Sequence, residues 1–315
     1  MDRLKVCFVG IGSIAKRHIV NLSEICREDN IELKVDALRH TLSDLPSEVN
    51  SIISNTYLRE NDMPSDYDVI FITNPTEYHI DTLKCLHDKG KNFFIEKPLT
   101  SYKNLSSVYD INYRPESIYY VACPLRYTNV IQYMKDIIKN EKVLCVRSIS
   151  SSYLPEWREN VDYRKTYSAN RNLGGGVSLD LIHEWDYLQY LFGEPEQILY
   201  HASKKSGLEL DCEDCAFYIA EYKDKIIELH LDYFGRKPIR QVMLFTENDT
   251  IVGDLTNSTV TYLKDGKSVL LEEKRNSFQK KELRYFLKMI NKEVENNNNI
   301  EQAVKTIKYT QGVVR

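Results

Sequence analysis

The chain has 315 residues, of which 42% are hydrophobic and 28% are charged. This balance is typical of a folded globular protein and excludes a disordered one. The length predicts about two domains. A formal net charge of −4 leaves no basic surplus to neutralise a phosphate backbone, so we expect no nucleic-acid partner.

Apolar runs in the chain are short. None reaches the roughly 18 residues that a membrane-spanning helix needs, so we expect no membrane partner and a cytoplasmic location. The seven cysteines lack the spacing of a disulfide framework, which also favours a reducing compartment. Cys212 and Cys215 form a CxxC pair, but no second pair of ligands lies nearby to complete a tetrahedral zinc site. We therefore expect no metal site.

The first third of the chain alternates strand and helix patterns. Strands are predicted at residues 4–9, 31–38, 68–73, 92–95 and 117–122, and helices at about 14–26 and 77–89. For the second helix, Thr76 is the expected N-cap and Gly90 the expected C-terminal stop. Repeated units of this kind predict an α/β Rossmann domain over residues 1–122, with a right-handed, doubly wound parallel sheet.

The pattern changes near Cys123 and becomes rich in strands. Residues 123–315 are predicted to form an α+β domain with a mostly antiparallel open sheet. Its expected strands are 143–153, 197–202, 216–223, 225–233, 241–247, 250–255 and 258–263, with helices at 129–139, 176–192, 279–295 and 300–312. Turns are expected at Asn248-Asp249 and Asp265-Gly266.

A glycine-rich turn joins the first strand to the first helix. In Gly10-x-Gly12-x-x-Ala15, Gly10 permits the tight turn and Gly12 lets a pyrophosphate approach the backbone. The helix that follows offers free N–H groups and the positive end of its dipole. Such turns also occur without nucleotides, but their place in the first strand–helix unit favours dinucleotide binding by Gly10, Gly12, Ser13 and Ile14.

The end of the second predicted strand bears on cofactor choice. An acidic residue there would bind the ribose 2′-OH of NAD, but Leu38 occupies that position and Arg39 follows it. Strand alternation turns Asp36 away from the ribose. Arg39 suits a 2′-phosphate, so NADP is preferred over NAD as the expected cofactor. The alternative is that Arg39 is an exposed loop residue.

Glu96-Lys97-Pro98 follows a predicted parallel strand, at the edge where open α/β sheets bind their ligands. A lysine at that edge is a candidate proton donor or acceptor, because desolvation and a nearby cationic ring both favour its neutral form. Pro98 disfavours a helical conformation at Lys97. The alternative is an ordinary surface lysine.

Three glycines at positions 174–176 precede Asp180 and His183. Residues three apart share a face of a helix, and a carboxylate beside an imidazole orients it and raises its basicity. The glycines indicate a close backbone approach or a sharp turn. We therefore favour a functional role for this histidine over a structural one.

The segment 151–169 is rich in Tyr, Trp and Arg. Flat apolar faces with polar tips suit a sugar, while an irregular loop covering the sheet is the alternative of equal weight. The candidate substrate-binding residues are Arg126, Tyr153, Trp157, Tyr163 and Tyr167.

Taken together, these motifs resemble the glucose–fructose oxidoreductase / inositol dehydrogenase (Gfo/Idh/MocA) family over roughly residues 4–255. The resemblance implies a catalytic lysine at Lys97, a catalytic histidine at His183 and the accompanying carboxylate at Asp180. It also implies that Glu96 and Pro98 shape the nicotinamide site, that Asn74 and Pro75 line the ribose, and that Thr73 and His79 belong to the cofactor-binding set. Many members space the Asp and His four residues apart, whereas the spacing here is three.

The resemblance implies an NAD(P)-dependent dehydrogenase or reductase acting on a hydroxyl or keto carbon of a sugar or sugar derivative. A weak similarity to a subgroup from surface-polysaccharide pathways extends the expected substrates to nucleotide-linked sugars. Two alternatives stay open: a glycoside-cleaving enzyme that recycles tightly bound NAD, and a non-catalytic sensor of NADP(H) or sugar. The open sheet implies a homodimer or homotetramer. The sugar, its reacting carbon and the direction of the reaction are left undetermined.

Overall fold

The computed structural model describes residues 1–314, which form two compact units. The first unit contains Met1–Ala122 and Gln279–Ala303, and the second contains Cys123–Phe278 and the residues from Val304 onward. The predicted division at residue 122 differs from this one in a single respect. Residues 279–303 return to the first unit, because helix α7 (Ser277–Ile290) packs on the first sheet.

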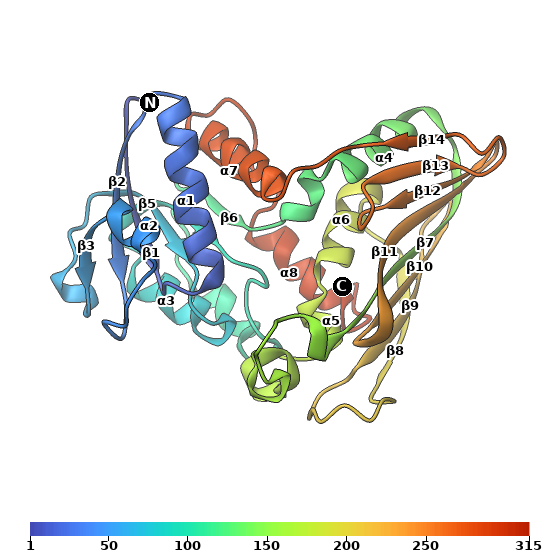
Figure 1. Ribbon diagram of the computed structural model, residues 1–315, viewed down its shortest axis with the longest axis horizontal. Coiled ribbons are helices and arrows are strands. Elements are labelled where there is room, and N and C mark those ends of the chain that lie inside the picture. The colour runs from blue at the N-terminus through green and yellow to red at the C-terminus, as the bar shows by residue number, and fades with distance from the viewer. Residues whose placement is uncertain (315) are drawn as a thin grey trace. The chain divides into compact units, whose positions relative to one another are not determined.

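The first unit is built on a parallel sheet, sheet A, with the strand order β3-β2-β1-β4-β5-β6 (Figure 1). This is the order of a doubly wound dinucleotide-binding sheet. Its strands are β1 (Arg3–Val9), β2 (Glu32–Leu38), β3 (Ile53–Tyr57), β4 (Tyr67–Ile72), β5 (Gly90–Ile95) and β6 (Tyr119–Val121). The helices of this unit are α1 (Ser13–Glu28), α2 (Ser47–Ile52), α3 (His79–Cys85) and most of α7.

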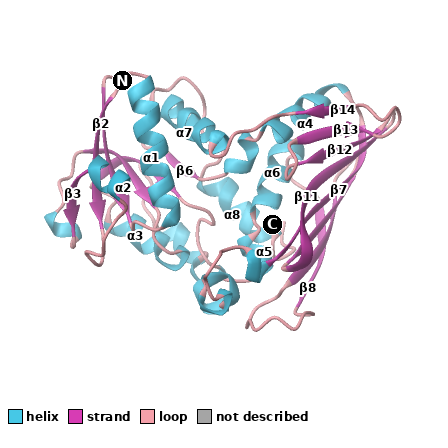
Figure 2. Cartoon of the chain, in the orientation of Figure 1, coloured by secondary structure: helices cyan, strands magenta, loops and turns pink. Residues whose placement is uncertain are grey.

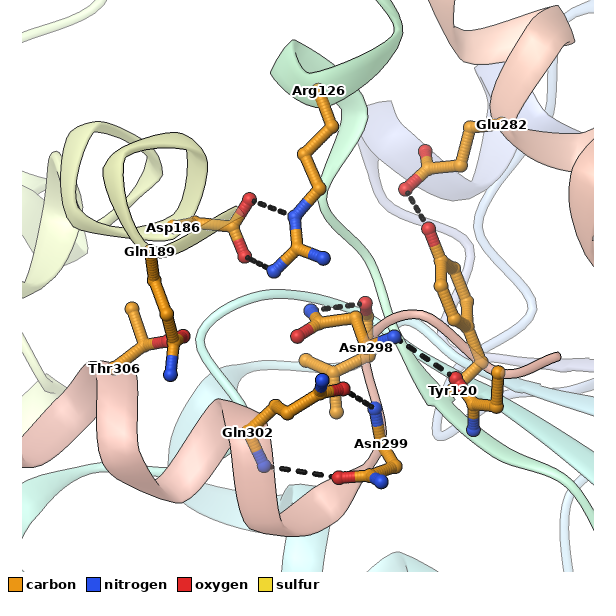
Figure 3. A network of polar contacts seen from close by, with 11 residues as sticks. Tyr120, Arg126, Asp186, Gln189, Glu282, Asn298, Asn299, Gln302 and Thr306 are labelled. Carbon is orange, nitrogen blue, oxygen red and sulfur yellow. Dashed lines mark hydrogen bonds and ion pairs between the residues drawn. The ribbon is translucent and has the colours of Figure 1, made fainter. Parts of the chain in front are cut away.

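Helices α1 and α7 cover the same face of sheet A. The ring of Phe94 on β5 contacts His18 of α1 at 5.1 Å and Phe286 of α7 at 5.2 Å, measured between ring centroids. At the neighbouring strand, the Tyr120 hydroxyl donates to Glu282 of α7 at 2.9 Å (Figure 3). These aromatic contacts make α7 part of the first hydrophobic core.

The helix predicted over residues 77–89 is shorter than expected. A 3-10 turn (Thr76–Tyr78) precedes α3, which ends at Cys85, and Thr76 makes no capping hydrogen bond. Gly90 does not terminate a helix but begins β5. A Cβ atom at Gly90 would lie 2.7 Å from Ile70 Cγ1, so packing on the adjacent strand requires this glycine. Helix α2 and edge strand β3 were not predicted, because their residues are largely polar and exposed.

The second unit is built on sheet B, with the order β14-β13-β12-β11-β7-β10-β9-β8 (Figure 2). Its neighbouring strands are antiparallel apart from the parallel pair β7 and β10. The strands are β7 (Val143–Tyr153), β8 (Gln197–Ser203), β9 (Cys215–Glu221), β10 (Ile226–Asp232), β11 (Phe234–Thr246), β12 (Thr250–Asp254), β13 (Thr259–Tyr262) and β14 (Ser268–Leu270).

Helices cover one face of sheet B, where its hydrophobic core lies. They are α4 (Asn129–Asn140), α5 (Val177–Asp180), α6 (His183–Phe192) and the end of α8 (Ile300–Tyr309). Strand β9 shows the consequence of this one-sided burial, because Tyr218 is buried while Phe217 and Ile219 on the opposite face are exposed. In the described chain, residues 1–314, no helix is long and apolar enough to cross a membrane.

Candidate active site

The turn after β1 is shaped by Gly10. This residue has a φ of +78°, and a Cβ atom there would lie 2.9 Å from Asn74 Cα. Its N–H donates to the Leu38 carbonyl at 2.9 Å, which ties the turn to the end of β2. Both the left-handed backbone and the close approach of Asn74 require a glycine at this position.

The beginning of α1 is open to a ligand. A Cβ atom on Gly12 would meet no other atom within 4 Å, and Gly12 and Ser13 are exposed while Ile14 is half-buried. The first turn of α1 contains no acidic residue and no side chain caps it. Unfilled N–H groups, the positive end of the helix dipole and free space above the turn fit the pyrophosphate of a dinucleotide.

At the end of β2, Asp36 is fully buried, and its carboxylate accepts hydrogen bonds from Tyr67 Oη at 2.9 Å and Asn55 Nδ2 at 2.8 Å. It is therefore engaged inside the fold rather than at the ligand edge. Arg39 is half-buried, and its Nη2 donates to the carbonyl and hydroxyl of Ser43 at 2.5 and 3.0 Å. The loop after β2 thus fixes the guanidinium near the end of that strand.

Thr73 and Asn74 follow β4. The Thr73 hydroxyl lies 2.9 Å from the Val9 carbonyl and 2.8 Å from the Gly10 carbonyl, which fixes the glycine turn. Asn74 Nδ2 donates to Thr82 Oγ1 at 2.7 Å. Its Oδ1 is buried and has no hydrogen-bond partner among the described residues 1–314. A buried acceptor beside the phosphate turn fits a donor group of a bound nucleotide.

Glu96 and Lys97 follow β5. Glu96 is buried, its Oε1 lies 2.6 Å from His18 Nε2, and its Oε2 accepts from the Lys97 N–H at 3.2 Å. Burial opposes ionisation, but the hydrogen bond and charge of His18, together with the Lys97 charge, hold the pKa of Glu96 below its usual value. Lys97 is half-buried. His18 was not predicted as a site residue, because it lies inside the helix predicted at about 14–26 and outside the motifs.

His79 connects two of the predicted motifs. It is 1% exposed, with Nε2 placed 2.8 Å from the Asn74 carbonyl and Nδ1 placed 3.0 Å from the Pro98 carbonyl. The carbonyl of Pro75 accepts from the Tyr78 N–H at 2.9 Å, which leads the chain into α3. The ring of His79 is therefore buried between two backbone turns, and a direct contact with the cofactor remains only a prediction.

In the second unit, Asp180 is buried and receives three hydroxyl hydrogen bonds. Ser168 Oγ donates at 2.7 Å, Tyr233 Oη at 3.1 Å, and Tyr167 Oη donates to the other carboxylate oxygen. Burial and the charge of Asp180 raise the pKa values of Tyr167 and Tyr233 well above the usual range. Both phenols therefore remain donors. Ser168 and Tyr233 were not predicted as site residues, because they lie 12 and 53 residues from Asp180 in the chain.

The helix predicted over 176–192 is interrupted between Asp180 and His183, where α5 ends and α6 begins. At the interruption, the Glu184 N–H donates to the Leu181 carbonyl three residues earlier, at 3.2 Å. A backbone tightened to three residues per turn aligns side chains three apart. The spacing of three between Asp180 and His183 thus matches the local backbone, and the half-buried His183 begins α6.

The aromatic segment after β7 is packed against its own unit. Arg236 lies over the Tyr153 ring at 3.9 Å, and Trp157 Nε1 donates to Ser152 Oγ at 2.9 Å. The Trp157 ring also meets Tyr233 edge-on, with 5.3 Å between the ring centroids. These contacts are those of an ordered loop covering the sheet.

One small hollow lies against this segment. Trp157, Tyr163 and Ser168 are among its lining residues, and its volume is about 10 Å³, close to the minimum for one water molecule. The Tyr163 hydroxyl accepts from the Glu209 N–H at 2.9 Å. A role for these side chains in substrate binding therefore stays a prediction.

Arg126 forms a buried ion pair with Asp186 (Figure 3). Its Nε and Nη2 atoms donate to the two carboxylate oxygens, each at 2.8 Å, and both side chains are nearly inaccessible. The guanidinium also lies 5.1 Å from the centroid of the Tyr190 ring. This bidentate geometry joins the turn before α4 to α6, so the described contacts of Arg126 are structural.

Within residues 1–314, no group of three or more His, Cys, Asp or Glu side chains is placed to hold a metal ion. Cys212 and Cys215 are buried free thiols, and burial raises the pKa of Cys212 to about 12. The thiolate form that binds metals is therefore disfavoured at Cys212.

Two family models match the chain. The oxidoreductase family with an NAD-binding Rossmann fold matches residues 4–122, and the Gfo/Idh/MocA C-terminal domain matches residues 131–252. A curated relative, the uncharacterized oxidoreductase YrbE of Bacillus subtilis, is 26% identical over 192 residues. That alignment covers 59% of this chain and 52% of the relative, so the chain matches about half of the relative's length.

Solved structures resemble the whole chain. A levoglucosan dehydrogenase in complex with NADH has a TM-score of 0.84 at 15% identity, covering 99% of this chain and 96% of that one. Myo-inositol 2-dehydrogenase from Lactobacillus plantarum scores 0.78 at 19% identity, with coverages of 98% and 95%. UDP-N-acetylglucosamine 3-dehydrogenase from Acidithiobacillus ferrooxidans scores 0.77 at 16% identity, with coverages of 99% and 97%. At these identities the likeness establishes the fold.

Proposed function

Because the chain belongs to the Gfo/Idh/MocA family of NAD-binding oxidoreductases, we propose that it transfers a hydride between a nicotinamide cofactor and a hydroxyl or keto carbon of a sugar or sugar derivative. One observation carries the proposal: the open glycine turn before α1 and the Glu96-Lys97-Pro98 turn lie at the same, carboxyl edge of sheet A. This is the ligand-binding edge of a doubly wound sheet. The dehydrogenases with similar folds act on levoglucosan, an inositol and a nucleotide sugar, which supports a polyol substrate.

Each candidate side chain has a proposed role. The nicotinamide ring, when bound, supplies the acceptor or donor of the hydride. In the oxidation direction, His183 or Lys97 takes the proton of the substrate hydroxyl. The Lys97 ammonium stabilises the negative charge that develops on the substrate oxygen. The carboxylate of Asp180 is held by three hydroxyl donors. It orients His183, which follows it by three residues, or one tight helical turn.

For the cofactor we propose a preference for NADP over NAD. Arg39 is held near the end of β2 by Ser43, where a guanidinium suits the 2′-phosphate. The carboxylate of Asp36, the nearest acid in that strand, already accepts hydrogen bonds from Tyr67 and Asn55. It is therefore not available to bind a ribose 2′-OH.

The first experiment measures binding of NAD⁺, NADH, NADP⁺ and NADPH to protein stripped of nucleotide. Binding of an NADP form at least tenfold tighter, which corresponds to about 1.4 kcal/mol, supports the Arg39 assignment. Equal affinities or tighter NAD binding contradict that assignment and leave the oxidoreductase function intact. Failure to bind any of the four contradicts the proposed function.

The second experiment follows reduction of the preferred cofactor with free sugars, inositols and nucleotide sugars. Turnover with one of these classes supports the dehydrogenase and identifies its substrate class. NAD that co-purifies, does not exchange and gives no net NADH release would instead indicate the glycoside-cleaving alternative. Cofactor-dependent capture of a stoichiometric partner protein, without turnover, would indicate the sensor.

We further propose that a second copy of the chain covers the exposed face of sheet B. The side chains of Leu199, Phe217, Ile219 and Ile226 are exposed on β8, β9 and β10. Exposed apolar patches of this kind mark association surfaces. The expected assembly is a homodimer or homotetramer.

A further inference from the structure

The residues on both sides of Lys97 in the chain make buried polar contacts. On its N-terminal side, the Glu96 carboxylate accepts the Lys97 backbone N–H at 3.2 Å and lies 2.6 Å from His18 Nε2. On its C-terminal side, the Pro98 carbonyl lies 3.0 Å from His79 Nδ1. The conformation of the turn that carries Lys97 therefore depends on two imidazole rings from different helices.

The first ring couples the lysine to the phosphate turn. His18 lies in the second turn of α1, whose first turn offers its open N–H groups to the cofactor. A displacement of α1 therefore moves His18, and through Glu96 it moves the backbone of Lys97. Because His18 is 1% exposed, its ring does not itself reach a ligand.

The second ring couples the lysine to the turn at the end of β4. His79 Nε2 lies 2.8 Å from the Asn74 carbonyl, so the ring spans the Asn74-Pro75 and Lys97-Pro98 turns. Both partners are acceptors, and a neutral imidazole carries one N–H. Burial lowers the pKa of His79, which favours the neutral ring. At neutral pH the ring therefore donates to one of the two carbonyls at a time.

We propose that His18 and His79 are positioning residues for Lys97. The inference rests on the proposed function, since it assumes that Lys97 takes part in the reaction. It assigns to both histidines a role that differs from cofactor contact, the role that the family resemblance implies for His79. The competing explanation is core packing, because His18 also meets the Phe94 ring edge-on at 5.1 Å.

Amide substitutions separate positioning from packing. The side-chain nitrogen of Gln occupies the place of Nε2, and that of Asn the place of Nδ1. At position 18 the bonded atom is Nε2, so His18→Gln retains the donor, whereas His18→Asn and His18→Leu lose it. At position 79, His79→Asn retains the donor to Pro98, His79→Gln retains the donor to Asn74, and His79→Leu removes both.

We expect the two Leu variants to lower kcat by roughly 10- to 100-fold, because small misplacements of a reacting group cost rates of that order. The dissociation constant of the cofactor should change less than threefold. His18→Gln should recover most of kcat and His18→Asn should not. His87→Leu is the matched control, since this histidine pairs with the exposed Asp88 and should leave kcat unchanged.

A second measurement does not require a substrate. Acetic anhydride acetylates accessible lysine amines, and peptide mass spectrometry gives the rate at Lys97 relative to the exposed Lys91. The Leu variants should change this ratio at least threefold, while His87→Leu should not. If the wild-type protein binds no cofactor, the proposed function fails, and the acetylation ratio still tests the positioning of Lys97.

Two results would overturn the inference. The first is a set of folded Leu variants with kcat and the acetylation ratio both within threefold of the wild-type values. The second is a loss of kcat that is proportional to the unfolded fraction of each variant and that is reversed by cooling the assay. In that case His18→Gln and His18→Asn would also lose the same amount of kcat. The latter would assign the two histidines to packing alone.

Discussion

Glu96 and Asp180 are both buried carboxylates next to a candidate acid–base residue, yet they are held in different ways. Glu96 is held by an imidazole and a backbone amide in the parallel-sheet unit. Asp180 is held by three hydroxyls in the antiparallel-sheet unit. The phenols that hold Asp180 have raised pKa values and keep their protons. These hydroxyls therefore form a fixed anchor for Asp180, whereas the neighbours of Glu96 lower the pKa of its own carboxyl group.

The largest effect should follow from removing the group that Glu96 positions. We expect Lys97→Met to lower kcat by about 10²- to 10⁴-fold, the usual contribution of a positioned acid or base. The melting temperature should stay near the wild-type value, since Lys97 is half-buried rather than part of the core. Lys91→Met, at an exposed lysine of β5, the strand that precedes Lys97, is the control in steady-state assays. Retention of full turnover by Lys97→Met would remove the lysine from the mechanism.

Replacing the anchored carboxylate should reduce both stability and activity. Asp180→Asn substitutes an NH₂ group for one acceptor, so at least one of the three hydroxyl donors loses its partner. Hydrogen bonds to a charged group contribute about 1.5–3 kcal/mol each, and we expect a loss of that size in the free energy of unfolding. Urea denaturation measures it. A change below about 0.5 kcal/mol would contradict the observed hydroxyl contacts.

Removing one hydroxyl tests whether the three donors to Asp180 share its stabilisation. Tyr233→Phe keeps the buried ring and its edge-on contact with Trp157, and it deletes one donor to Asp180. We expect a loss of about 1.5 kcal/mol in the free energy of unfolding, the lower end of the range for one bond to a charged group, because Asp180 keeps its other two hydroxyl donors. The same substitution at exposed Tyr109 should have no effect on the denaturation midpoint.

The pH dependence of stability should arise from the first unit. The pKa of His79 is lowered from its ordinary value of 6.5, and that of Glu96 from 4.5. A group with a lower pKa in the folded state adds stability that is present above the unfolded pKa and is lost as the pH falls through the folded pKa. Stability should therefore decrease below about pH 6.5, and again below about pH 4.5. The first decrease should be absent in His79→Gln, as measured by denaturation at a series of pH values.

The smallest change in the free energy of unfolding is expected from a substitution on the exposed face of sheet B. Ile219→Ser changes an exposed side chain, and such substitutions usually alter stability by less than about 0.5 kcal/mol. If a second copy covers this face, the substitution should lower the mass measured by light scattering. An unchanged oligomer would place the interface elsewhere, and a monomeric wild-type protein would contradict the predicted assembly.

Local patterns were sufficient for much of the fold. The structure places β7 at Val143–Tyr153, the predicted limits, because its apolar and β-branched residues form one continuous pattern. The prediction was wrong at Gly90, where a glycine required by Ile70 of the adjacent strand was interpreted as a helix stop. It also treated 176–192 as one continuous helix, because the interruption between α5 and α6 has no proline or glycine to indicate it.

The sequence by itself determined the two fold classes, the phosphate turn and the motifs that contain Lys97, Asp180 and His183. These depend on short-range features: periodicity, glycine spacing and the end of an apolar strand. Only the tertiary structure decided that α7 joins the first sheet, that Arg126 pairs with Asp186, and which side chains hold the two carboxylates. His18 contacts Glu96 across 78 residues and Tyr233 contacts Asp180 across 53. Partners this far apart in the chain are selected by packing, which no local pattern encodes.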